Sequence, residues 1–132
     1  MPESQTHLNL VRQIKTYINL NFSNSKNFLV LSDTPESLNN LPQIINNEFR
    51  PDVFAEDNNG RTIIGEAKTT NDLEKLHSKN QIRCFISYLM EKQDGILILA
   101  VPLSSLNTAK NLIRRIKRGL GAANVKSECI VG

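Results

Sequence analysis

The chain has 132 residues and a formal net charge of +3, with 39% hydrophobic and 22% charged residues. This length suits a single domain, residues 1–132, with one core, and the composition is that of a globular protein rather than a disordered or membrane-spanning chain. Aromatic residues make up 5% and tryptophan is absent, which argues against a surface of aromatic rings for stacking nucleic-acid bases.

The N-terminal segment, residues 4–20, is predicted to form a helix. Leu10, Ile14 and Ile18 recur at helical spacing and make one apolar stripe. Charged side chains interrupt residues 1–20. We therefore expect neither a signal peptide nor a membrane-spanning helix at this end of the chain.

A β-hairpin is predicted in the middle of the chain. A short strand at 28–31 and a loop at 32–47, with at most one helical turn, precede it. Its strands are residues 49–56 and 61–68, which flank Asp57-Asn58-Asn59-Gly60. Asparagine and glycine tolerate the positive φ angles that hairpin turns require.

The second half of the chain alternates helices with strands. Its predicted elements are a helix from Asn71 or Asp72 to Lys92, a strand at 96–101, a helix from Ser104 or Ser105 to Gly119 or Gly121, and a strand at 125–131. The strand at 96–101 is apolar throughout, as in strands buried on both faces. The order α-β-β-β-α-β-α-β predicts an α/β domain in which helices flank a mixed β-sheet.

Three polar residues mark a candidate site on the hairpin. In a strand, residues i and i+2 share a face, so Glu66 and Lys68 point the same way. Asp52 lies on the partner strand, and its side of the sheet depends on the turn. A three-residue loop, 58–60, places it opposite Glu66, whereas a two-residue loop, 59–60, places the two acids on opposite faces. A three-residue loop that ends in glycine is a recognised hairpin type.

The chemistry of this trio indicates a divalent cation. Two carboxylates side by side on a sheet face repel each other unless a cation lies between them. Mg²⁺ binds one or two carboxylates, polarises a phosphodiester and lowers the pKa of a bound water. We expect Asp52, Glu66 and the backbone carbonyl of Ala67 to bind Mg²⁺, with Mn²⁺ as the alternative ion. The Lys68 ammonium would then stabilise charge that develops on the phosphate.

These residues carry a family resemblance. Pro51-Asp52 on one strand and Glu66-Ala67-Lys68 on the next, followed by a helix, resemble the PD-(D/E)xK nuclease superfamily. The resemblance implies a restriction-endonuclease-like fold, Mg²⁺ bound by the Asp and the Glu, and a Lys that assists hydrolysis. It also implies a Gln on the next helix, which is Gln81, although Phe85 stands where several members have Tyr.

The same resemblance implies an acid on or near the first helix. Glu3 is one candidate because it lies on the same stripe as His7 and Leu10. Glu36 and Glu48 are the alternatives, and the sequence does not choose among the three.

The last helix carries a basic face beside its apolar one. Its members are Lys110, Arg114, Arg115, Lys117 and Arg118. Such a face either solubilises a helix or neutralises nucleic-acid phosphates. Next to a nuclease site, we expect it to contact DNA.

The expected function is a Mg²⁺-dependent endonuclease that hydrolyses DNA. No helix-turn-helix or zinc-finger pattern is present, so we expect DNA structure or a partner protein to direct it. Cutting both strands favours a homodimer. Cys84 and Cys129 lack zinc-ligand spacing and suit a reducing, cytoplasmic setting. The alternative is a non-enzymatic nucleic-acid-binding or assembly subunit that retains a nuclease fold.

Overall fold

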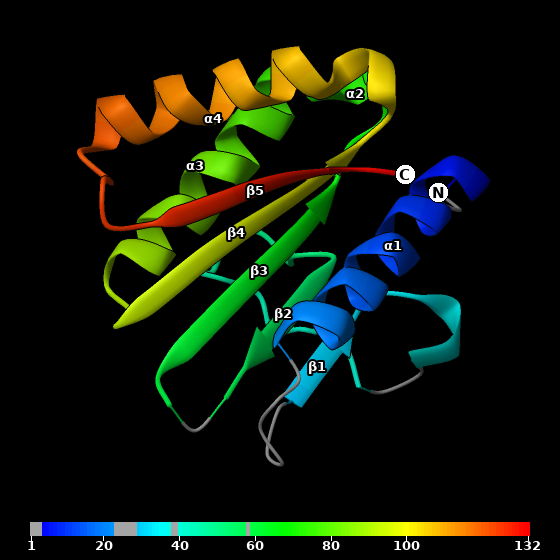
Figure 1. Cartoon of the computed structure of the whole chain (residues 1–132), viewed down its shortest axis with the longest axis horizontal. Helices are drawn as coiled ribbons and strands as arrows, with labels where there is room; N and C mark the ends of the chain where they lie inside the picture. The colour runs from blue at the N-terminus through cyan, green and yellow to red at the C-terminus, as the bar shows by residue number, and fades with distance from the viewer. Residues whose placement is uncertain (1–3, 23–28, 38–39, 58) are drawn as a thin grey trace.

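A computed structural model describes residues 4–22, 29–37, 40–57 and 59–132 (Figure 1). The described chain is an α/β structure in which helices lie on both faces of a five-stranded mixed β-sheet. This arrangement confirms the predicted fold class at that level. None of the helices in the described ranges combines the length and the apolar character that crossing a bilayer requires.

The elements follow the predicted order. The helices are α1 (Gln5–Phe22), α2 (Thr70–Leu73), α3 (Leu76–Met90) and α4 (Leu106–Leu120), and the strands are β1 (Leu29–Ser32), β2 (Val53–Glu56), β3 (Arg61–Ala67), β4 (Asp94–Val101) and β5 (Lys126–Val131). Short 3-10 turns lie at Pro35–Ser37 and Leu103–Ser105. The strands lie side by side in chain order. β2 is antiparallel to both of its neighbours, β1 and β3, whereas β4 and β5 run parallel to β3.

Helix α1 covers one face of the sheet, and α3 and α4 cover the other (Figure 1). On the α1 face, Ile14 and Ile18 pack against Ile63 of β3. Glycine at position 65 lets this helix approach closely, because a Cβ atom there would lie 2.5 Å from Cγ2 of Ile14. Strands β3 and β4 are therefore buried on both faces, which accounts for the continuous apolar run at 96–101 in β4.

Two predicted boundaries are wrong. The helix expected from residue 71 to 92 is two helices, because Lys75 adopts an extended backbone with ψ of 147° between α2 and α3. The strand expected from Phe49 begins only at Val53. Proline at position 51 has no N–H to continue the ladder, and Phe49 instead forms an isolated bridge with Ile45.

Candidate functional site

The register of the hairpin brings residues 52 and 66 together. Val53 pairs with Gly65 and Glu56 pairs with Thr62, so the next position places Asp52 beside Glu66. Towards the turn, the Asp57 amide donates to the Arg61 carbonyl at 3.1 Å. This is the register predicted for a three-residue loop, whose first residue, position 58, lies outside the described residues.

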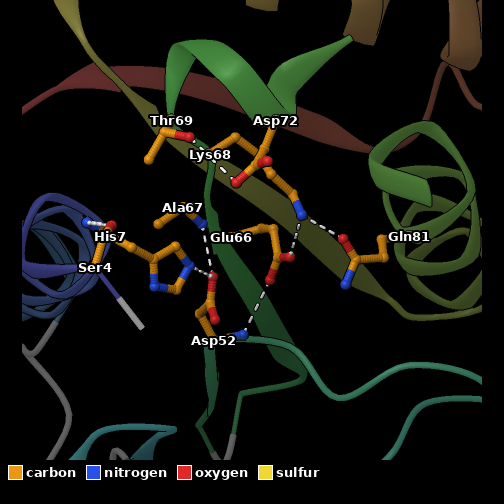
Figure 2. Close-up of polar contacts among 9 residues, drawn as sticks. All are labelled: Ser4, His7, Asp52, Glu66, Ala67, Lys68, Thr69, Asp72 and Gln81. Atoms are coloured by element: carbon orange, nitrogen blue, oxygen red, sulfur yellow. Dashed lines mark hydrogen bonds and ion pairs between the residues drawn. The ribbon is translucent and has the colours of Figure 1, made fainter. Parts of the chain in front are cut away.

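Asp52 and Glu66 are joined through backbone amides at the beginning of β2. The Ala67 amide donates to Oδ2 of Asp52 at 2.9 Å, and the Asp52 amide donates to Oε1 of Glu66 at 3.1 Å (Figure 2). Because β2 begins at Val53, no strand residue is available to accept from Ala67, and the Asp52 carboxylate takes that place. Both carboxylates therefore meet at the carboxyl end of β3.

Lys68 completes this cluster. Its Nζ lies 3.2 Å from Oε2 of Glu66, and it also donates to Oε1 of Gln81 on α3 (Figure 2). Glu66, Lys68 and Asp52 are 2%, 8% and 7% exposed. The four residues predicted to form the catalytic centre are thus linked by direct contacts, and we call Asp52, Glu66, Lys68 and Gln81 the carboxylate centre.

His7 also contacts the carboxylate centre, a role that was not predicted from the sequence. It projects from α1, with Nε2 3.2 Å from Oδ2 of Asp52 (Figure 2). Its place on the apolar stripe with Leu10 and Ile14 was the available signal, because a polar side chain on a core-facing stripe needs a polar partner inside the fold. The contact fixes the orientation of the Asp52 carboxylate between α1 and β3.

The electrostatics of the centre disfavour two ionised carboxylates. Burial raises the pKa of Glu66 well above its usual range, and the nearby charge of Asp52 raises it further. The ammonium of Lys68 opposes this shift only in part. A second positive charge between the carboxylates would relieve the remaining cost.

No protein-family model, curated protein or solved structure matches this chain. Any assignment of function therefore rests on the residues of the carboxylate centre and on their geometry.

The donor set of the centre fits a hard divalent cation. Such a cation needs only one or two carboxylates, with water and a substrate phosphate as further ligands. Asp52 and Glu66 supply the carboxylates, and the predicted third ligand is the carbonyl of Ala67, whose amide already bonds to Asp52. Among the described residues, no group of three or more His, Cys, Asp and Glu side chains is arranged to hold a metal.

Of the three additional acids considered in the sequence, the two that the structure describes are exposed and do not contact the carboxylate centre. Glu36 pairs with Arg12 at 3.4 Å on the exposed surface. Glu48 is also exposed. Glu3 lies outside the described residues.

The basic residues of α4 lie away from the carboxylate centre. Three of them, Lys110, Arg114 and Lys117, line a hollow beside β5. The other two, Arg115 and Arg118, are exposed and do not line it. Strand β4 separates β5 from β3, so any substrate that contacts this helix must extend well beyond the centre.

Proposed function

We propose that the protein is a metal-dependent endonuclease that hydrolyses phosphodiester bonds in DNA. The observation that carries the proposal is the convergence of Asp52 and Glu66 from neighbouring strands, with the Lys68 ammonium 3.2 Å from Glu66. Membership of the PD-(D/E)xK superfamily and a restriction-endonuclease-like fold are parts of the same proposal.

Each residue of the centre has a distinct task. Asp52, Glu66 and the Ala67 carbonyl hold Mg²⁺ or Mn²⁺, which when bound polarises the phosphate and acidifies a water. Lys68 places a positive charge where negative charge develops during hydrolysis. Gln81 is a positioning residue, since its amide oxygen holds the ammonium of Lys68 from α3.

The substrate and its selection are also proposed. The basic residues of α4 contact DNA, and DNA structure or a partner protein selects the site of cutting. A homodimer supplies two centres for the two strands of a duplex.

The direct test is cleavage of linear, nicked, single-stranded and branched DNA with Mg²⁺ or Mn²⁺. Lys68→Ala is expected to lower kcat by about 100- to 1,000-fold, as the loss of a preorganised electrostatic group does elsewhere. Lys126→Ala is the matched control, because it removes an exposed ammonium from the other end of the sheet. Wild-type protein that binds DNA yet cuts no substrate with either ion would support a non-enzymatic binding subunit instead.

A further inference from the structure

A basic hollow lies between α4 and the edge strand β5. Its volume is about 430 Å³, and we call it the α4–β5 trough. It is lined by Lys110, Ile113, Arg114, Lys117, Ser127, Glu128 and Cys129. Figure 1 shows α4 running alongside β5 at this edge of the sheet.

The cations of the trough form a line. Lys110, Arg114 and Lys117 are spaced i, i+4 and i+7, so they share one flank of α4 and span about 10 Å along its axis. Arg115 is turned about 100° from Arg114 and lies on a different flank. Arg118 is one turn beyond Arg114 and does not line the trough. The helix therefore divides its five basic residues into a trough set and an outer set.

The charge of the trough suits an anion. Glu128 borders the trough, but it shares the α1 face of β5 with Ile130, and its charge acts on Tyr17 of α1. Burial raises the pKa of Cys129 to about 11, although Lys110 opposes the shift, so this thiol is neutral at pH 7. Among the described residues, no carboxylate forms an ion pair with the three cations, whereas Lys126 pairs with Asp94 at 3.2 Å.

The trough has a defined position relative to the carboxylate centre. Glu66 pairs with Leu99, and Leu99 pairs with Cys129, so the three residues form one row across the sheet. Two strand spacings separate the ends of this row, which is about 10 Å. A phosphate in the trough is therefore not the one that the centre cleaves.

We infer that the α4–β5 trough binds the sugar-phosphate backbone of double-stranded DNA at a distance from the cleaved bond. The inference rests on the proposed nuclease function and narrows its substrate to a duplex. Proteins hold single strands largely by stacking bases on aromatic rings, and no aromatic residue lines the trough. A duplex, by contrast, offers a rigid and regular line of phosphates to a straight row of cations.

The test compares two double variants that each remove two positive charges from α4. The trough variant is Arg114→Ala/Lys117→Ala, and the matched control is Arg115→Ala/Arg118→Ala. Alanine is the best helix former, so both variants should retain α4. Binding to a 20-base-pair duplex and to a 20-nucleotide single strand is measured against salt concentration without a divalent cation, so that no strand is cut.

The trough variant is expected to bind the duplex more weakly, and the slope of log affinity against log salt should fall by about 0.9 for each of two phosphates. The control variant should keep the wild-type slope. Equal weakening of both variants would overturn the inference, and so would equal weakening of the trough variant towards single strand and duplex. Cleavage of DNA by the wild-type protein would support the proposed function whichever way the trough variant binds. If the wild-type protein cleaves no DNA, the proposed function is wrong, whatever the trough binds.

Discussion

The two ends of strand β3 carry charged clusters that contain similar residues in opposite environments. At its beginning, Arg61 and Lys126 pair with Asp94 at 3.3 and 3.2 Å. At its end, Lys68 pairs with Glu66 at 3.2 Å, beside the second acid Asp52. Asp94 in the first cluster is partly exposed and contacts two cations, whereas Glu66 in the second is buried and contacts one ammonium beside a second acid.

This difference distinguishes an ion cluster that stabilises the fold from one that we propose to bind a cation. Despite the cost of partial burial, Lys126 and Arg61 lower the pKa of Asp94, so its ionised form is favoured in the folded protein. At the other end, burial and Asp52 raise the pKa of Glu66. The carboxylate centre thus retains an electrostatic cost that a bound cation would relieve.

The largest expected effect is that Mn²⁺ stabilises the folded protein by binding at the carboxylate centre, at one end of β3, and not at Asp94, at the other end. A ligand at 100 times its Kd stabilises the folded state by about 2.7 kcal/mol. Asp52→Asn should abolish the Mn²⁺-induced rise in Tm, because it removes a proposed ligand. Asp94→Asn should retain that rise, although its own stability without the ion should be lower. Thermal unfolding at increasing Mn²⁺ concentration measures the change in Tm of both variants. An equal rise in Tm in the two variants would contradict binding of the ion at the carboxylate centre only.

A smaller effect is expected from the histidine that holds Asp52. Residues that orient a metal ligand typically change metal affinity by about 10- to 100-fold. His7→Ala should therefore raise the apparent Kd for Mn²⁺ by about that factor while cleavage at saturating Mn²⁺ changes less. Isothermal titration gives the affinity, and kcat at saturating ion gives the second readout.

His77→Ala is the matched control for this histidine. His77 is exposed on α3 and makes an edge contact with Phe49, with ring centroids 5.4 Å apart. Its removal should leave the affinity for Mn²⁺ unchanged. A His7→Ala protein that is folded and binds Mn²⁺ as tightly as the control would show that His7 does not position Asp52.

The sequence was sufficient to predict features whose causes are local. The sequence left two hairpin registers open, and it supplied Gly60, whose φ of 87° suits the end of the three-residue loop in the observed register. That register, together with the alternation of side chains along a strand, brings Asp52, Glu66 and Lys68 together. The helix that carries Gln81 was also evident from its apolar spacing.

Features that depend on packing between distant elements were not predictable. The contact between His7 and Asp52 requires α1 to cross the sheet at one particular angle, which no local pattern encodes. The break at Lys75 depends on a single backbone angle, and the side-chain spacing on either side continues as in one helix. The division of the basic residues of α4 became clear only once β5 was placed beside that helix.

The smallest expected effect is an opposite pH dependence of stability at the two ends of β3. Glu66 has a folded-state pKa above its ordinary value of 4.5. Its contribution to the stability of the folded protein is therefore fully present below pH 4.5 and is lost as the pH rises through the raised pKa. Asp94 has a lowered pKa, so its contribution is present above the ordinary value of 3.8 and is lost as the pH falls through the lowered pKa. Each of these two carboxyl groups changes the slope of the unfolding free energy against pH by at most about 1.4 kcal/mol per pH unit.

Paired variants isolate these two slopes. Without divalent cations, Glu66→Gln should remove a loss of stability that the wild type shows above pH 4.5, and Asp94→Asn should remove a loss that the wild type shows below pH 3.8. Urea unfolding between pH 3 and 8 measures the free energies, with Glu36→Gln as an exposed carboxylate control. Saturating Mn²⁺ should cancel the Glu66 effect, because a cation between the two carboxylates favours their ionised forms. If the wild type and Glu66→Gln curves run parallel above pH 4.5, the buried acid carries no electrostatic cost, and the physical reason for expecting a cation at this end of β3 disappears.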